Sequence, residues 1–237
     1  MYFRRHAKTC SRRSANRVYP MDQQTVKNQL YADGLISIIR GSFGLRETMQ
    51  MAEALLAGGV KIVEVTLNST NALAGIRDLQ RQFGQEMQVG AGTIRSADDV
   101  QKAVDAGASF LIAPCLDLPS VEAAAQQGTL LLPGIFTASE AQAAFVAGCQ
   151  TVKLFPAEVG GPTYLKALRA PLEHIDFIPT GGVTSETITD FHRAGAVAFG
   201  VGSALVKNVA MTPEELTALT ERAAALTRAL KKARAGA

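Results

Sequence analysis

Two ionisable side chains interrupt segments whose other residues are typical of buried strands. Lys153 lies within 151–155 (TVKLF) and Glu64 lies within 62–67 (IVEVTL). Successive side chains of a strand point to opposite faces, so Lys153 should share a face with Thr151 and Phe155, opposite its aliphatic neighbours. A desolvated lysine has a lowered pKa, and its neutral amine can attack a carbonyl carbon. A nearby carboxyl group can move protons to and from the carbinolamine and imine that follow.

Two alternatives to this imine chemistry stay open. Lys153 and Glu64 can form a buried ion pair with a structural role only, although such pairs contribute little net stability. Metal chemistry has few candidate ligands, because the histidines are predicted to lie in the basic N-terminal segment, in a loop and on an outer helix, and the cysteines are widely spaced. We therefore expect neither a metal ion nor a cofactor.

Eight β-rich segments alternate with amphipathic segments along the chain. We predict strands at 35–41, 62–67, 88–93, 110–114, 130–135, 151–156, 176–182 and 196–203. Strands that alternate with helices pair in parallel through right-handed crossovers. Eight such units favour an α/β fold of the (β/α)8 barrel type, with a doubly wound open sheet as the alternative. An extra helix over 22–34 should cover the bottom of the barrel, and a long helix should span 212–235.

Glycines gather where the last two predicted strands end. The segment 179–182 reads PTGG, and the segment 200–204 reads GVGSA. Backbone N–H groups of glycine can approach an anion closely, and barrels often bind phosphate in their last two loops. Thr180, Gly181, Gly182, Gly202 and Ser203 are therefore predicted to bind a phosphate, with Ser203 at the start of a short helix. The alternative is that these glycines only permit tight turns.

Other strand ends contribute further candidate groups at the same mouth. Arg40 ends the first strand and brings a positive charge suited to a carboxylate or phosphate, although it can equally pair with a surface loop. Thr93 ends the third strand, and Pro114 shapes the end of the fourth. Cys115 follows Pro114 as a small filler or a reactive thiol, with no base identifiable near it.

Charge is unevenly distributed along the 237 residues, of which 47% are hydrophobic and 19% charged. Residues 1–20 hold six of the 24 basic residues and no acidic residue, so 21–237 carry 18 basic residues against 21 acidic ones. Two interpretations of 1–20 stay open, a targeting or anion-binding arm and a start-site extension without a fold. Residues 21–237 are expected to form one domain of a cytoplasmic protein. We expect no membrane segment and no nucleic-acid partner.

Five segments resemble one family of enzymes. They are 64–67 (EVTL), 90–93 (GAGT), 132–134 (LPG), 153–158 (KLFPAE) and 179–182 (PTGG). In this order they resemble the class I 2-keto-3-deoxy-6-phosphogluconate (KDPG) aldolases and 4-hydroxy-2-oxoglutarate (KHG) aldolases. The resemblance covers about residues 30–210.

The resemblance implies a barrel lyase, usually a homotrimer, that cleaves a phosphorylated keto acid to pyruvate and glyceraldehyde 3-phosphate. It implies that Lys153 is the Schiff-base lysine and Glu64 the general acid and base. Thr93 corresponds to the family's pyruvate-binding threonine. Thr180, Gly181, Gly182 and Ser203 match the segments that hold the rest of the substrate and its phosphate.

The segment after Thr66-Leu67 departs from the gluconate-type pattern. Gluconate-type members often have an arginine there for the pyruvyl carboxylate, whereas this chain has Asn68-Ser69. That feature and the segment 38–41 (IIRG) resemble the 6-phosphogalactonate branch, and Arg40 is a candidate for the carboxylate role. Outside the family, a phosphosugar isomerase or synthase barrel and a non-catalytic anion-binding protein remain alternatives.

Overall fold

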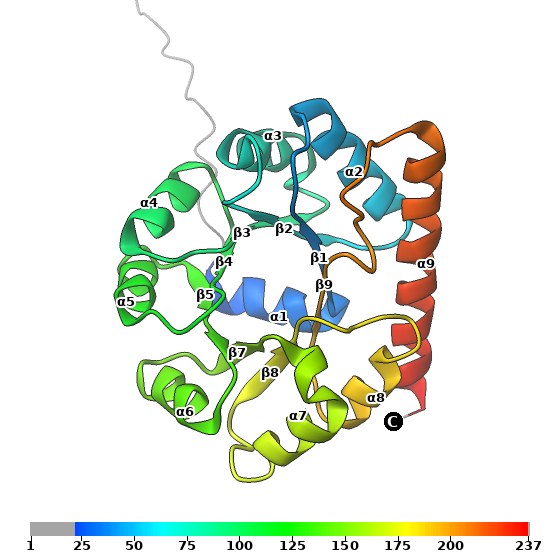
Figure 1. The fold of residues 1–237 in the computed structure, drawn as a ribbon. Coiled ribbons are helices and arrows are strands. Elements are labelled where there is room, and N and C mark those ends of the chain that lie inside the picture. Colours follow the sequence, from blue (N-terminus) through cyan, green and yellow to red (C-terminus); the bar gives the residue numbers. More distant parts are fainter. Residues whose placement is uncertain (1–21, 237) are drawn as a thin grey trace, which may run out of the picture.

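The computed structural model describes residues 22–236, in which helices surround a ring of parallel strands (Figure 1). The two interpretations of residues 1–20 lie outside the described residues. The strands are β1 (Leu35–Ile39), β2 (Ile62–Thr66), β3 (Gln88–Gly92), β4 (Phe110–Ile112), β5 (Leu130–Leu132), β6 (Gly134–Ile135), β7 (Thr151–Leu154), β8 (Asp176–Pro179) and β9 (Phe199–Val201). The helices are α1 (Gln23–Asp33), α2 (Leu45–Ala57), α3 (Ala72–Phe83), α4 (Ala97–Asp105), α5 (Leu118–Gln126), α6 (Ala138–Val146), α7 (Gly161–Arg169), α8 (Ile188–Arg193) and α9 (Pro213–Ala235), with a short 3₁₀ turn η1 (Ala157–Val159).

The ring consists of two hydrogen-bonded arcs. One arc has the order β5-β4-β3-β2-β1-β9 and the other the order β6-β7-β8. They join at Pro133, between β5 and β6, and at a parallel bridge from Thr180 to Gly200. Strands that follow one another along the chain are therefore neighbours around the ring. This order confirms the barrel and excludes the open doubly wound sheet.

The fifth predicted strand, 130–135, is wrong as a single element. β5 pairs with β4, whereas β6 pairs with β7, and Pro133 lies where the partner changes. Proline has no N–H to donate, so the ladder is interrupted at that residue. The other predicted strands all extend past the observed C-terminal ends, by the most at β8, which ends at Pro179. The last prediction, 196–203, also begins too early, because β9 spans only Phe199–Val201.

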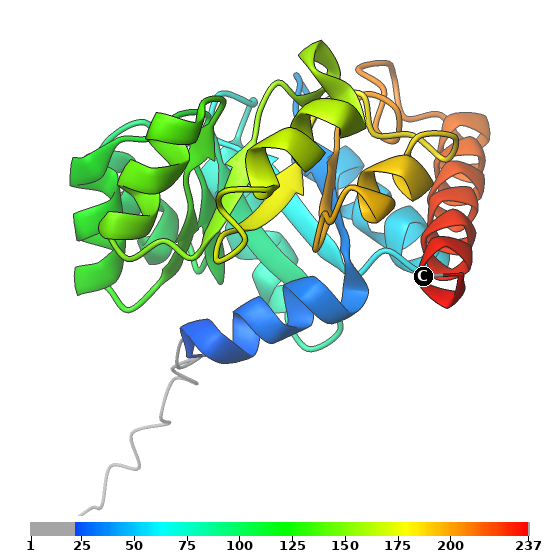
Figure 2. The same cartoon turned by 90° about the horizontal axis from the view of Figure 1, so that it is seen from below.

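Side chains inside and outside the ring form two separate apolar clusters. The outer cluster lies between strands and helices and includes Val63, Val65, Val152 and Leu154. The inner cluster consists of Val26, Leu30, Ile36, Ile62, Phe110, Ile112, Leu132, Ile178 and Ala198. Two of these residues come from α1, which passes beneath the ring as predicted (Figure 2).

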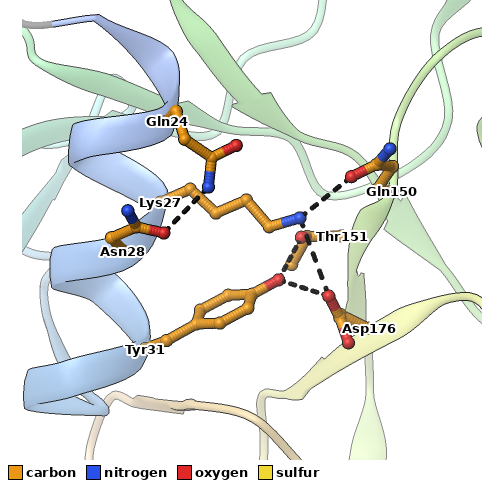
Figure 3. Close-up of polar contacts among 7 residues, drawn as sticks. All are labelled: Gln24, Lys27, Asn28, Tyr31, Gln150, Thr151 and Asp176. Atoms are coloured by element: carbon orange, nitrogen blue, oxygen red, sulfur yellow. Dashed lines mark hydrogen bonds and ion pairs between the residues drawn. The ribbon is translucent and has the colours of Figure 1, made fainter.

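Polar contacts attach α1 to the feet of β7 and β8 (Figure 3). The Tyr31 Oη lies 2.5 Å from the Thr151 Oγ1 and donates a 2.7 Å hydrogen bond to the Asp176 Oδ2. The Lys27 Nζ lies 3.7 Å from the same carboxylate oxygen and donates to the Gln150 Oε1 at 3.2 Å. Burial raises the pKa of Tyr31, so its hydroxyl remains a donor. A cavity of about 320 Å³ lies beside Lys27 at this bottom end, away from the carboxyl ends of the strands.

We expect Tyr31→Phe to lower the free energy of unfolding by about 1–3 kcal/mol, because a partly buried hydrogen bond to a charged acceptor is lost. Chemical denaturation measures the change. Gln24→Ala is the control on the same helix, since it removes only an exposed hydrogen bond to Asn28. Equal stability of Tyr31→Phe and the wild type would contradict the anchoring role.

Among residues 22–236, no helix is both long enough and apolar enough to span a bilayer.

Candidate active site

Lys153 points into the barrel from the middle of its strand. Its neighbours Val152 and Leu154 belong to the outer cluster, so alternation places Lys153 on the inner face. The side chain is 8% exposed, and its Nζ lies 5.0 Å from the centre of the Phe155 ring. These contacts confirm the predicted orientation of Lys153. They place an amine in a largely apolar setting close to the end of β7.

Glu64 is the second ionisable group inside the ring, and it is 2% exposed. Burial raises the pKa of Glu64, because its carboxylate is removed from water, while the charges of Lys153 and then Arg40 act in the opposite direction. Glu64 therefore lies within electrostatic reach of both cations. Its raised pKa favours a carboxyl group that can hold and release a proton.

The structure argues against a purely structural pairing of these two groups. Within the described range 22–236, none of the ion pairs shorter than 4.0 Å joins Lys153 to Glu64. Two opposite charges kept inside a barrel without direct contact cost desolvation energy and gain little from each other.

Gly92 lies directly against the Glu64 carboxyl group, a contact that the sequence alone does not indicate. A Cβ built at Gly92 would lie 1.6 Å from the Glu64 Oε1, so only glycine leaves room for this carboxyl group. Glycine inside a strand is a signal of such close approach, and it was present in the segment 88–93. The next residue, Thr93, has a φ of +62°, a left-handed conformation that is costly for a β-branched residue.

We expect Gly92→Ala to displace the Glu64 side chain and to lower both activity and stability. Overpacking of a buried site costs about 1–3 kcal/mol. Gly75→Ala is the matched control, because its new Cβ would make an ordinary 3.5 Å contact with the Thr48 Cγ2 on the outer layer. Turnover and denaturation midpoints of both variants test the expectation. An active, stable Gly92→Ala protein would contradict it.

Arg40 follows the end of β1 and is exposed, and its neighbour Gly41 is held by a contact from the loop after β2. Gly41 N–H donates to the Ser69 Oγ at 3.1 Å, and that hydroxyl lies 2.9 Å from the Thr66 Oγ1. Ser69 thus links the ends of the first two strands. It supports the backbone next to Arg40, a contact that the sequence alone did not indicate.

The last two strand ends lie side by side at the same mouth. The bridge from Thr180 to Gly200 brings the loops together, and the Ala157 N–H donates to the Thr180 carbonyl oxygen at 2.8 Å. Gly181 and Gly182 have φ values of +98° and +70°. A Cβ at Gly202 would meet no heavy atom within 4 Å, so that position faces open space.

The short helix predicted to start at Ser203 is wrong. Residues 203–205 form a turn, closed by the N–H groups of Leu205 and Val206, which both donate to the Gly202 carbonyl oxygen at 2.9 Å. Both N–H groups find their acceptor within this single turn, and the chain then continues without regular structure to α9. Ser203 is exposed at the mouth.

The remaining candidate residues, Pro114 and Cys115, follow the end of β4. Pro114 is half-buried after β4, where a Cβ at Gly134 would lie 2.3 Å from its carbonyl carbon. Cys115 is exposed. Burial raises the pKa of Cys149, far from the mouth, to about 11. Among residues 22–236, no three His, Cys, Asp or Glu side chains are grouped to hold a metal ion.

Comparisons with known proteins match most of the chain. A family model described as "Aldolase: KDPG and KHG aldolase" matches residues 26–222. The KHG/KDPG aldolase of Escherichia coli K12 is 35% identical over 180 residues, which cover 76% of this chain and 84% of that protein. The 2-dehydro-3-deoxy-6-phosphogalactonate aldolase of the same organism is 33% identical over 200 residues, covering 84% and 95%.

A solved structure is similar over the same region. It is the KDPG aldolase from Legionella pneumophila, described with pyruvate captured at low pH as a covalent carbinolamine intermediate. The two structures superpose with a TM-score of 0.75 at 30% identity, covering 83% of this chain and 96% of that one.

Proposed function

Because this chain belongs to the KDPG and KHG aldolase family and is therefore a lyase, we propose that it cleaves 2-dehydro-3-deoxy-6-phosphogluconate to pyruvate and glyceraldehyde 3-phosphate. A second substrate in the proposal is 4-hydroxy-2-oxoglutarate, which would give pyruvate and glyoxylate. The observation that carries the proposal is the pair of inward-facing groups, Lys153 and Glu64, which are buried inside the barrel without a direct ion pair.

The reaction begins with the Lys153 amine attacking the C2 carbonyl carbon of the substrate. Loss of water gives an iminium ion, with Glu64 moving the protons, directly or through a water molecule. The iminium accepts the electron pair of the C3–C4 bond as the C4 hydroxyl loses its proton, so the aldehyde leaves and an enamine remains. Protonation at C3 and addition of water then release pyruvate and the free lysine. This sequence uses no metal ion and no cofactor.

We propose that separate groups at the mouth bind the two ends of the substrate. Arg40 and Thr93 are proposed to hold the pyruvyl carboxylate, with Phe155 and Pro114 packing against the carbon chain. Thr180, Gly181, Gly182, Gly202 and Ser203 are proposed to bind the phosphate through backbone N–H groups and a hydroxyl. The positive-φ glycines and the open space at Gly202 support this assignment.

A phosphogalactonate substrate is the second candidate. It is favoured by Asn68-Ser69, by the contact of Ser69 with the backbone beside Arg40, and by the relative named for that activity. A pyruvate-release assay on the phosphogluconate-derived, phosphogalactonate-derived and hydroxyoxoglutarate substrates tests the choice. The highest kcat/KM with the phosphogalactonate-derived acid would overturn the first assignment, and pyruvate release from none of them would overturn the function.

We also propose that the protein is a cytoplasmic homotrimer that acts on small molecules and not on nucleic acid. Two large apolar side chains support self-association, since Leu118 and Val146 are 53% and 78% exposed. They line one hollow between α5, α6 and the segment Pro171–Leu172. Exposed apolar surface of this kind is often covered by another subunit. Sedimentation velocity checks the trimer, and a monomer at assay concentration would contradict it.

A further inference from the structure

A carboxylate lies directly against the proposed phosphate loop. Glu158 belongs to η1, four residues after the end of β7, and it is exposed. A Cβ built at Gly181 would lie 1.8 Å from the Glu158 Oε2, and one built at Gly182 would lie 2.8 Å from the Glu158 Cβ. The Glu158 side chain therefore occupies the space beside both glycines, and the hydrogen bond from the Ala157 N–H to the Thr180 carbonyl oxygen joins the backbones of the two segments next to it.

The charge of Glu158 is not neutralised by a direct partner. None of the ion pairs formed among residues 22–236 includes it. Glycine N–H groups attract an anion through partial charges, whereas a full negative charge a few ångströms away repels one. The glycine N–H groups of the loop thus attract any anion, whereas Glu158 repels an anion more strongly as its negative charge increases.

We propose that Glu158 selects substrates by the charge of their distal end, because its carboxylate weakens the binding of a phosphate dianion more than that of a carboxylate monoanion. This inference rests on the proposed function and extends it to tail selection. Glu158 thereby reduces the difference in kcat/KM between phosphorylated substrates and those that end in a carboxylate, such as 4-hydroxy-2-oxoglutarate. It is a specificity-determining residue of the distal end, far from the bond that breaks.

Glu158→Gln keeps the size of the side chain and removes its charge. At one pH, we expect kcat/KM of this variant to rise about three- to tenfold for each unit of negative charge on the tail, because removing Glu158's partly screened charge removes its repulsion of the tail. The phosphorylated acid should gain most, the carboxylate-ended acid less, and the six-carbon keto acid without phosphate should not change. The gain should appear in KM with kcat unchanged, because the tail does not alter in the transition state. It should also shrink as salt is added.

Glu173→Gln is the matched control, since Glu173 is an exposed carboxylate in the loop before β8, at the opposite end of the barrel. It should leave all three substrates unaffected. Equal gains in both variants would assign the effect to net charge and overturn the proposal. A gain independent of tail charge, or a loss of affinity for the phosphorylated acid in Glu158→Gln, would overturn it as well.

Binding of inorganic phosphate, followed by ³¹P NMR, separates this inference from the proposed function. Glu158→Gln should bind phosphate more tightly than the wild type and Glu173→Gln, whether or not the protein releases pyruvate. A wild type without lyase activity that still shows this difference would overturn the proposed function alone. Equal phosphate affinities in the three proteins would overturn the role of Glu158 alone.

Discussion

Lys153→Met should lose pyruvate release by several orders of magnitude while the protein remains folded. Methionine is similar in length and fills an apolar space, so the variant loses the amine without leaving a large cavity. Removing a nucleophile that forms a covalent intermediate eliminates the pathway itself and not only a contribution to binding. The free energy of unfolding should stay equal or increase, because a polar group is no longer desolvated inside the barrel.

Reduction with borohydride in the presence of pyruvate checks the imine directly. The wild type should gain the mass of one reduced pyruvyl group on Lys153, and Lys153→Met should gain none. Lys102→Met is the matched control, since Lys102 lies on the surface of α4 and pairs with Asp98. It should be trapped and active like the wild type. A wild type that processes substrate but is never trapped would instead favour the isomerase or synthase chemistry considered above.

Glu64→Gln should lower kcat by about 10²- to 10⁴-fold, the usual contribution of a general acid or base. Glutamine keeps the shape of the side chain beside Gly92 but can neither accept nor release a proton at this site. Imine formation with pyruvate should slow in parallel, since both steps move protons. Glu53→Gln, on the exposed side of α2, is the control and should retain full activity.

The same variant has a pH-dependent effect on stability. The pKa of Glu64 is raised in the folded protein above its usual value of 4.5, so folding favours the protonated form. The wild type therefore loses stability as the pH rises from about that value through the raised pKa. Glu64→Gln lacks this loss, and its stability relative to the wild type should increase with pH over the same window. Denaturation at pH 4 and at neutral pH measures this, and a constant difference would contradict the raised pKa.

Local patterns predicted the parts of the site that depend on a single strand. The alternation in 151–155 and 62–67 was enough to orient Lys153 and Glu64, and the outer cluster confirms that orientation. The capping box at the start of α6 is a feature of the same local kind, in which the Thr137 hydroxyl accepts from the Glu140 N–H. These features involve residues a few positions apart, so the sequence displays them directly.

Contacts between distant segments were not predictable in the same way. In the sequence, Gly92 is only a residue near the end of a predicted strand, and its closeness to the Glu64 carboxyl group appears only when β2 and β3 pair in register. In the sequence, Glu158 is only the last residue of the segment 153–158, and its contact with Gly181 exists because β7 and β8 are neighbours. Pro133 was included in one strand because its change of partner depends on two other strands.

The sequence by itself determined the fold class, the extra helix beneath the barrel and the two ionisable groups that face inward. All three follow from periodicity and composition, which act over one element at a time. Only the tertiary structure decided that Lys153 and Glu64 form no ion pair, that Gly92 makes room for the carboxyl group and that Glu158 lies beside the glycine loop. Those relations depend on register and ring closure, and these are set by packing across the whole barrel.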